Sequence, residues 1–307
     1  MTNVAIKLGS FAVGLALLFG LAFAVGHAVR PVSGDRAVPG HQAGGMDGHD
    51  ESADPSQKSQ TLPGLAVSEQ GYTLVPERVS YASGSRQPFR FAITGPDGQA
   101  VQHYRLAHEK ELHLIVVARD LGSFQHLHPT RGADGTWSAT LDLSEPGPYR
   151  VFADFTPEAS PSALTLGVDV FVAGHYVPAA LPEPADVATV DGYQVTLSGA
   201  PVADEESVLS FRVSRDGRAV GDLEPYLGAF GHLVSLRVGD LAYLHTHPAM
   251  MAEAGQRGGP SVQFATTFPT AGSYRLFLDF KHGGSVHTAA FTVTVDRHGH
   301  PTASPTR

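Results

Sequence analysis

Residues 113–129 read HLIVVARDLGSFQHLHP, and residues 232–248 read HLVSLRVGDLAYLHTHP. Each stretch has an apolar run, a short polar segment and a second run that ends in His-Pro, which predicts two antiparallel strands joined by a tight turn. Both stretches also contain the pattern H-x12-H-x-H-P. A predicted β-hairpin with three histidines at the same spacing therefore occurs twice in one chain.

The two hairpins lie within a longer duplication. Three further segments match between the copies: GYTL (71–74) with GYQV (192–195), FRFAITGPDGQAV (89–101) with LSFRVSRDGRAV (209–220), and PYRVFADF (148–155) with SYRLFLDF (273–280). The offset is 119 residues across the histidines and 125 at the last match, so the second copy has about six additional residues after Pro248. A repeat of this length predicts two complete domains in tandem.

Both copies consist of short β-branched and aromatic runs separated by turn residues. The 307 residues include 34 glycines and 22 prolines and contain no long segment with helical periodicity. This pattern predicts an all-β chain with two tandem β-sandwich domains, Ig-like or cupredoxin-like. Tyr149 and Tyr274 each begin a predicted strand after a glycine-containing turn, which is typical of a structural tyrosine corner.

The N-terminus contains an apolar segment, Leu8 to Val29, without a formal charge. Its 22 residues are long enough to cross a hydrocarbon core of about 30 Å as a helix. The segment therefore predicts a single-pass transmembrane helix in the cell membrane. Lys7 before it favours an orientation with the body of the protein outside the cytoplasm. The alternative is a signal peptide, because AFA at 22–24 matches a cleavage site, and the protein would then be secreted.

A tether rich in Gly, Ser, Asp, Gln and Pro follows, and it has too few apolar residues to form a core. Within it, five side chains are potential metal donors in what is otherwise a solvated linker: His41, Met46, Asp47, His49 and Asp50. The expected segments are 1–30, transmembrane anchor or signal peptide; 31–65, disordered tether; 66–174, first β-sandwich; 175–187, proline-rich linker; 188–296, second β-sandwich; and 297–307, disordered tail.

Charge and composition limit which classes of ligand the chain can bind and which side chains can hold a metal. The formal net charge is −9, so the chain has no basic surface for nucleic acid. It has no cysteine, so a bound metal would be held by His, carboxylate, Met or backbone oxygen. The 16 histidines are therefore the residues to explain.

The hairpin turns predict which histidines meet. A turn centred on Gly239-Asp240 places His232 opposite His247 and Val234 opposite His245. The same offset in the first copy centres the turn on Asp120-Leu121, and it places His113 opposite His128 and Ile115 opposite His126. In each copy the three imidazoles then project from one face of the hairpin.

Three imidazoles on one face suit a copper or zinc ion. The predicted metal ligands are His113, His126 and His128 in the first domain and His232, His245 and His247 in the second. Accessory ligands or hydrogen-bond partners are His108, Asp154, Asp279, His282 and His287. The alternative is a structural role for each His-Pro at the end of a strand.

The hairpins and the His-containing tether resemble an exported, membrane-anchored actinobacterial family of uncharacterised proteins, described as heavy-metal-binding or secreted. FQHLHP (124–129) is also similar to the corresponding strand of small copper-associated β-sandwich modules of the YtkA and FixH-like type. These resemblances imply a body outside the cytoplasmic membrane and a link to copper or another transition metal.

Two functions follow as hypotheses. The first is extracytoplasmic binding or buffering of copper or zinc through a three-histidine site in each domain. The alternative is a non-catalytic Ig-like interaction or structural module of the cell envelope, with an envelope protein as partner and no metal. We expect no enzyme, because no nucleophile motif, HExxH helix or paired-carboxylate signature accompanies the histidines.

Overall fold

The computed structural model describes residues 62–244 and 246–297, and this part of the chain is all β, with no helix. The described residues accordingly offer no helix that is long and apolar enough to span a membrane. The predicted transmembrane segment, most of the tether with its metal donors, and most of the tail lie outside the described residues.

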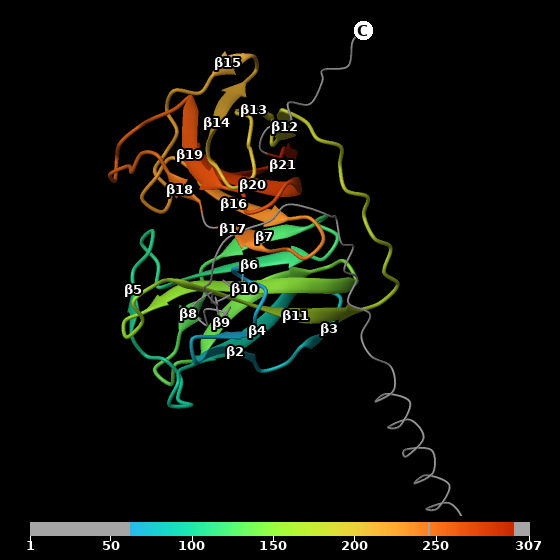
Figure 1. The fold of residues 1–307 in the computed structure, drawn as a ribbon, viewed down its shortest axis with the longest axis vertical. Coiled ribbons are helices and arrows are strands. Elements are labelled where there is room, and N and C mark those ends of the chain that lie inside the picture. The colour runs from blue at the N-terminus through green and yellow to red at the C-terminus, as the bar shows by residue number, and fades with distance from the viewer. Residues whose placement is uncertain (1–61, 245, 298–307) are drawn as a thin grey trace, which may run out of the picture. The chain divides into compact units, whose positions relative to one another are not determined.

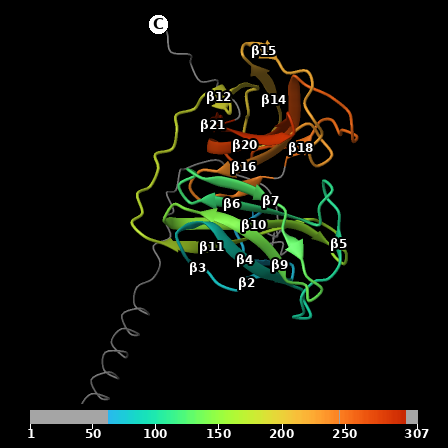
Figure 2. The same cartoon turned by 180° about the vertical axis from the view of Figure 1, so that it is seen from behind.

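The first domain is a sandwich of two sheets (Figures 1 and 2). One sheet has the strand order β1 (Ser68–Glu69), β2 (Tyr72–Pro76), β4 (Gly84–Thr94), β9 (Trp137–Leu143) and β8 (Thr130–Arg131). The other has the order β3 (Ser80–Ala82), β11 (Leu164–Ala173), β10 (Gly147–Pro157), β6 (Leu112–Ala118) and β7 (Phe124–Leu127), and β5 (Tyr104–Arg105) also pairs with β10.

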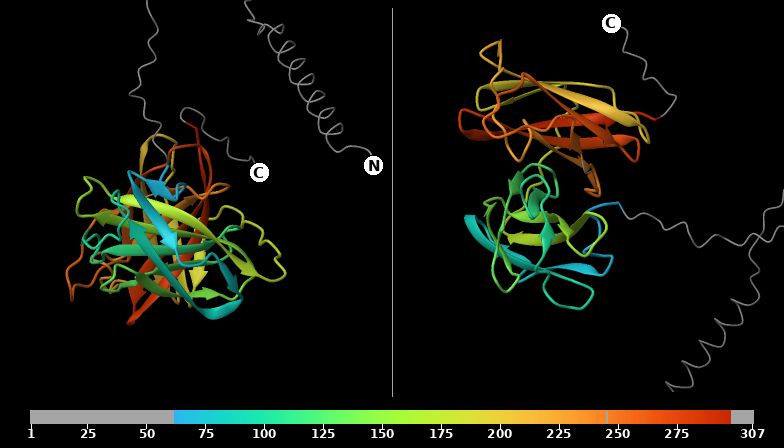
Figure 3. Two further views of the ribbon diagram at one scale, coloured as in Figure 1. Left: turned by 90° about the horizontal axis from the view of Figure 1, so that it is seen from below. Right: turned by 90° about the vertical axis from the view of Figure 1, so that its left-hand side faces the viewer.

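The second domain repeats this arrangement, and Figure 3 shows the layers of both sandwiches. One sheet has the order β12 (Val187–Val190), β13 (Tyr193–Ser198), β14 (Glu206–Arg215), β19 (Ser261–Thr267) and β18 (His247–Pro248), with β15 (Arg218–Ala219) on β14. The other has the order β17 (Tyr243–Leu244), β16 (His232–Arg237), β20 (Gly272–His282) and β21 (Ser285–Val295). The predicted pair of tandem β-sandwiches is confirmed.

Each sandwich has its own apolar core, because alternate strand residues point inward. The inward residues of β10 are Tyr149, Val151, Ala153 and Phe155. Those of β20 are Tyr274, Leu276, Leu278 and Phe280. The hydroxyl of Tyr149 donates to the Glu145 carbonyl at 2.9 Å, and that of Tyr274 donates to the Thr270 carbonyl at 2.9 Å. Both predicted tyrosine corners are thereby confirmed.

A third apolar cluster lies between the two domains, which belong to one compact unit. It contains Ile115 and Val117 from the outer face of β6, and Val234 and Leu236 from the outer face of β16. All seven residues of β6 are buried as a result. A strand covered on both faces reads as an unbroken apolar run, which is why this segment of the sequence does not alternate.

The contacts between the domains are reciprocal. Phe124 of the first domain stacks on Phe277 of the second, with ring centroids 4.0 Å apart. Tyr243 of the second domain is the sequence equivalent of Phe124, and Phe152 of the first domain is that of Phe277. The ring centroids of Tyr243 and Phe152 are 5.6 Å apart. An exchange of this kind is the property of an isologous interface, so the duplicated domains pair through the same surface of each copy.

The predicted register of the first hairpin is confirmed, because Ile115 lies opposite His126. In the second hairpin Leu236 lies opposite Tyr243, also as predicted. Residue 245 lies outside the described residues, Thr246 is no longer in a strand, and His247 pairs with Ala265 of β19 in the other sheet. The predicted pairing of His232 with His247 is therefore wrong.

A hydroxyl group explains the early end of the second hairpin. Thr246 Oγ1 donates to the Leu233 carbonyl, the acceptor that the Thr246 N–H would use if the ladder continued. A side chain that takes over a ladder bond in this way favours the end of a strand. The equivalent residue of the first copy, Leu127, has no hydroxyl and stays in the ladder opposite Leu114.

The predicted disordered tether was expected to reach residue 65, but its last residues are ordered. The Pro63 carbonyl accepts from the Tyr243 N–H at 2.9 Å. Arg150 donates to the carbonyls of Gly64 and Leu65 at 2.6 Å and 2.8 Å. A buried guanidinium requires acceptors, and these backbone oxygens supply them, so this segment belongs to the folded unit.

Candidate metal site

The three histidines of the first hairpin converge at the interface between the domains. His113 lies on β6, His126 on β7 and His128 directly after β7. Nδ1 of His113 lies 3.1 Å from Nε2 of His126 and 3.3 Å from Nε2 of His128. The ligand atoms of all three lie within 4.8 Å of one another, the single group of this kind among residues 62–244 and 246–297.

Hydrogen bonds determine which nitrogen of two of these rings carries its proton. Nε2–H of His113 donates to the Ala107 carbonyl at 3.0 Å. Nδ1–H of His126 donates to the Asp279 carboxylate at 2.8 Å. In neutral imidazoles the other nitrogens, 3.1 Å apart, then carry lone pairs that face each other. Facing lone pairs repel, so this arrangement favours a cation between them, either a proton or a metal ion.

Burial keeps two of the imidazoles neutral. His113 is 6% exposed. Burial, more than any other cause, lowers the pKa of His113 to about 4 and the pKa of His128 to about 3, and the neighbouring His126 lowers both as well. Neutral imidazole is the form that binds metal ions, so these two side chains are ready to bind at neutral pH.

Two of the three distances between the ligand nitrogens fit a tetrahedral metal ion, and the third is within 4.8 Å. Ligand nitrogens about 2.05 Å from a tetrahedral zinc ion are about 3.3 Å from each other. The nitrogens of His126 and His128 lie 3.1 Å and 3.3 Å from Nδ1 of His113. Three imidazoles leave a fourth position for water or another ligand, a donor set that suits zinc and copper.

A tight turn of the first domain orients His113. Ala107 and Lys110 exchange backbone hydrogen bonds of 2.9 Å and 3.0 Å around His108 and Glu109. The central residues have φ values of 48° and 65°, and positive values at both positions are those of a type I′ turn. The turn presents the Ala107 carbonyl to the ring of His113.

The second domain has the same turn. Tyr226 and Ala229 exchange backbone hydrogen bonds around Leu227 and Gly228, which have φ values of 57° and 75°. The Leu227 carbonyl accepts from Nε2 of His232 at 3.4 Å. In both copies a carbonyl of this turn thus accepts from the first histidine of the pattern, although Leu227 is the equivalent of His108 and not of Ala107.

His232 of the second domain lies beside the histidine cluster of the first domain. Its ring centroid lies 4.6 Å from that of His108 and 5.9 Å from that of His113. Burial, and then His108, lower the pKa of His232 to about 2. His245 and the side chain of His247 lie outside the described residues. The backbone of His247 pairs with Ala265 of the opposite sheet, and the predicted site of the second domain stays a prediction.

The two predicted carboxylates have different partners. Asp279 of the second domain accepts from His126 of the first. Asp154 of the first domain accepts from Thr165 at 3.3 Å. It also acts on Tyr243 of the second domain: burial, and then the Asp154 carboxylate, raise the pKa of Tyr243 well above its usual value.

The remaining accessory histidines lie elsewhere on the second domain. Nδ1 of His282 lies 2.7 Å from the Tyr193 hydroxyl, and Nε2 lies 3.1 Å from Asp222. Nδ1 of His287 lies 2.7 Å from Asp191. Neither histidine belongs to the converging group, so their predicted role as ligands of a second site is not supported.

Sequence patterns did not identify Tyr226 as a neighbour of the site. Its ring centroid lies 6.2 Å from those of both His128 and His232. No motif could have found it, because the contact depends on the pairing of the domains. The sequence did contain one sign that the domains pair. An apolar residue lies two positions after the first histidine of each copy, Ile115 and Val234, on the outer face of its strand.

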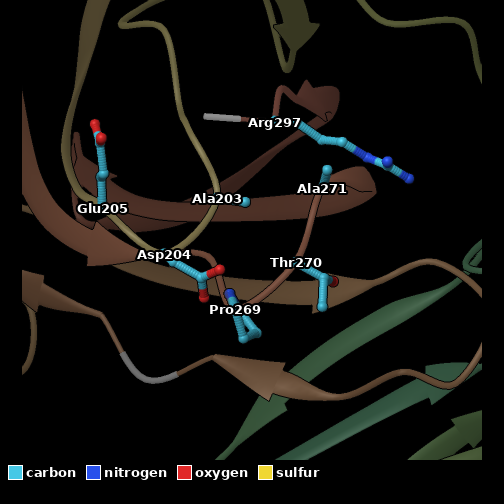
Figure 4. Close-up of a pocket in the computed structure, with 7 residues that line it drawn as sticks. All are labelled: Ala203, Asp204, Glu205, Pro269, Thr270, Ala271 and Arg297. Carbon is cyan, nitrogen blue, oxygen red and sulfur yellow. The ribbon is translucent and has the colours of Figure 1, made fainter. Parts of the chain in front are cut away.

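A pocket on the second domain is separate from the histidines (Figure 4). It is lined by Ala203, Asp204, Glu205, Pro269, Thr270, Ala271 and Arg297. The charged side chains of Asp204, Glu205 and Arg297 point in different directions in Figure 4. They do not converge on a common point, so this pocket is not a candidate for metal binding.

Comparison with known proteins identifies a family. The family model described as Domain of unknown function (DUF8832) matches residues 67–171 and again residues 188–297. No curated protein matches the chain. The comparisons give no support for the likeness to actinobacterial exported proteins or to copper-associated YtkA and FixH-like modules, which stays a prediction.

Among solved structures, similar chains include the Escherichia coli adhesin FdeC, with 14% identity, coverage of 76% of this chain and 66% of that one, and a TM-score of 0.24. The D0-D1 domain of intimin has 13% identity, 73% and 97% coverage and a TM-score of 0.21. The Yersinia pseudotuberculosis adhesin InvE has 11% identity, 75% and 60% coverage and a TM-score of 0.22. The chain thus spans about two thirds or less of FdeC and InvE, and scores this low say nothing about its activity.

Proposed function

We propose that this chain, which belongs to the DUF8832 family through both of its domains, binds one zinc or copper ion at His113, His126 and His128. The observation that carries the proposal is the pair of lone pairs on His113 and His126, which face each other at 3.1 Å. A metal ion would replace their repulsion with two coordinate bonds. The proposal concerns the triplet of the first domain, because His245 and the side chain of His247 lie outside the described residues.

The surroundings support retention of the ion rather than turnover. The side chain of His126 is 4% exposed, and the site lies beside the apolar cluster that joins the domains. Such a site would release metal slowly, which suits storage or buffering. We place this activity outside the cytoplasmic membrane, with residues 1–30 as the anchor and the donors of the tether as a first, looser point of capture.

A second candidate function is supported by the bond between His126 and Asp279. This contact joins the two domains directly, and a proton between His126 and His113 would satisfy the facing nitrogens without metal. The histidines would then be a clamp within a non-catalytic Ig-like interaction or structural module. The first function predicts that the full chain binds one equivalent of metal through these histidines. The second predicts that it does not.

Isothermal titration of the full chain with Zn²⁺ and Cu²⁺ tests the proposal. The combined change His113→Ala, His126→Ala and His128→Ala should remove one equivalent of bound metal per chain. The matched control, His282→Ala with His287→Ala, removes two histidines outside the site and should retain that equivalent. All variants keep the donors of the tether, so background binding stays constant.

A milder variant protects the test against misfolding. His128 lies after the end of β7 and is less buried than His113, so His128→Ala should fold and bind the ion more weakly. Binding of the same stoichiometry and affinity in wild type, His128→Ala and the triple variant would contradict metal binding at this site and leave the clamp.

A further inference from the structure

We infer that Asp279 of the second domain sets the metal affinity of the site in the first domain, so that metal binding and the pairing of the two domains stabilise each other. This inference rests on the proposed metal site. It assigns Asp279 as a positioning residue, since its carboxylate acts on the ion through the ring of His126.

The contact between Asp279 and His126 is buried and direct. Oδ2 of Asp279 lies 2.8 Å from Nδ1 of His126, and the two side chains are 3% and 4% exposed. The hydroxyl of Thr288, on the neighbouring strand β21, donates to Oδ1 of Asp279 at 2.6 Å. Both carboxylate oxygens therefore have a partner, and the orientation of the group is fixed before any ion binds.

The carboxylate determines which tautomer His126 adopts. An ionised carboxylate only accepts hydrogen bonds, so it holds the proton of His126 on Nδ1 and leaves the lone pair on Nε2. Nε2 is the nitrogen that lies 3.1 Å from His113. A carboxylate behind a ligand histidine also raises the basicity of that ligand, and its loss typically reduces metal affinity about 10- to 100-fold.

The position of Asp279 in the fold makes this effect an interdomain one. Asp279 lies on β20 opposite His232, on the face of the sheet that meets the first domain. If the domains separate, His126 loses its acceptor and the preference for the required tautomer. By linkage, the factor by which paired domains favour the ion equals the factor by which the ion favours paired domains.

The duplication provides a matched control for this residue. Asp154 is the sequence equivalent of Asp279, lies opposite His113 on β6 and is bonded by Thr165 as Asp279 is bonded by Thr288. Both ring nitrogens of His113 already have other close partners. The orientation of the His113 ring is therefore set by the Ala107 carbonyl, and Asp154, which is similarly buried, serves as the control.

The experiment compares Asp279→Asn with Asp154→Asn in the full chain, titrated with Zn²⁺. Asparagine has nearly the same shape, but it removes the charge and can turn its amide toward His126, which favours a proton on Nε2. We expect affinity to fall about 10- to 100-fold in Asp279→Asn and to change far less in Asp154→Asn. The Cu²⁺ electron paramagnetic resonance spectrum of Asp279→Asn should lose the hyperfine contribution of one nitrogen, which a general loss of stability would not cause.

A second pair of variants covers the case in which Asp279→Asn does not fold. Thr288→Val keeps the carboxylate but removes the hydroxyl that orients it, and Thr165→Val is its control. Of these two variants, only Thr288→Val should weaken Zn²⁺ binding. Equal affinities within each pair and an unchanged Cu²⁺ spectrum would overturn the role of Asp279 while leaving the metal site intact. If instead the proposed metal site does not exist, the histidine variants will bind metal as the wild-type chain does.

Discussion

The two hairpins of this chain have the same histidine spacing and different structures. In the first, β6 and β7 pair as far as Leu127, and His128 stays beside His113. In the second, Thr246 is no longer in a strand, and His247 pairs with the opposite sheet. The ladder position that differs is Leu127 in one copy and Thr246 in the other. The same histidine spacing thus occurs in two hairpins whose backbones take different courses after the turn.

The comparison also shows how one copy supports the other. His232 and Asp279 of the second domain contact the cluster of the first. The paired aromatic residues at the interface exchange roles between the domains. The two copies use equivalent surfaces to pack against each other, but the side chains around their histidines differ. Three experiments test this comparison.

The largest expected effect comes from the interface. Phe277 is 3% exposed and stacks on Phe124, so Phe277→Ala leaves a cavity between the domains. We expect the free energy of unfolding to fall by about 3–5 kcal/mol, and by a similar amount for its equivalent, Phe152→Ala. Denaturant unfolding measures both, with Phe171→Ala, at a ring that is 53% exposed, as control.

A double-mutant cycle sharpens this measurement. Phe124→Ala combined with Phe277→Ala should show a coupling of about 0.5–1.5 kcal/mol, as expected for stacked rings in contact. A cost for Phe277→Ala no greater than that for Phe171→Ala, with no coupling to Phe124, would mean that the domains do not pair through this face.

An intermediate effect is expected at the two turns beside the site. Glu109 and Gly228 hold equivalent positions with φ values of 65° and 75°, a conformation that costs a residue with a Cβ about 1 kcal/mol. Glu109→Gly should therefore stabilise the chain by about 0.5–1 kcal/mol, and Gly228→Ala should destabilise it by about the same amount. Thermal and denaturant unfolding test both, and a change of the same sign in the two variants would contradict equivalent turns.

The smallest effect belongs to the turn of the second hairpin, where Arg237 donates to Asp240 at 3.0 Å. The first copy has Leu121 at the position of Asp240. The hydrogen bond from Arg237 lowers the pKa of Asp240 below its usual value of 3.8. Its contribution to stability is therefore present above pH 3.8 and is lost as the pH falls through the lowered pKa.

Asp240→Asn should cost less than about 1 kcal/mol at pH 7, because the pair is partly exposed. Unfolding at pH 7 and at a pH well below 3.8 tests the sign: wild type and variant should converge in acid. A difference that stays constant or grows toward low pH would show that the charge of Asp240 does not contribute.

Much of the fold could be predicted from local patterns. The sandwiches, the tyrosine corners and the register of the first hairpin depend on alternation, turn residues and short-range pairing. The end of the second hairpin could not be predicted from the spacing of its histidines, because it depends on a hydroxyl, Thr246, whose choice of acceptor is visible only in the folded strand pair. Asp279 was identified as a potential second partner of a histidine, but which histidine it would bind depended on how the domains pair.

By itself, the sequence determined two tandem all-β domains and the convergence of His113, His126 and His128, because hydrophobic alternation and hairpin register act over a few residues. Only the tertiary structure decided that the carboxylate behind the first triplet comes from the other domain. The physical reason is that the outer faces of β6 and β16 bury each other's apolar residues. That packing brings together side chains more than 150 positions apart in the chain.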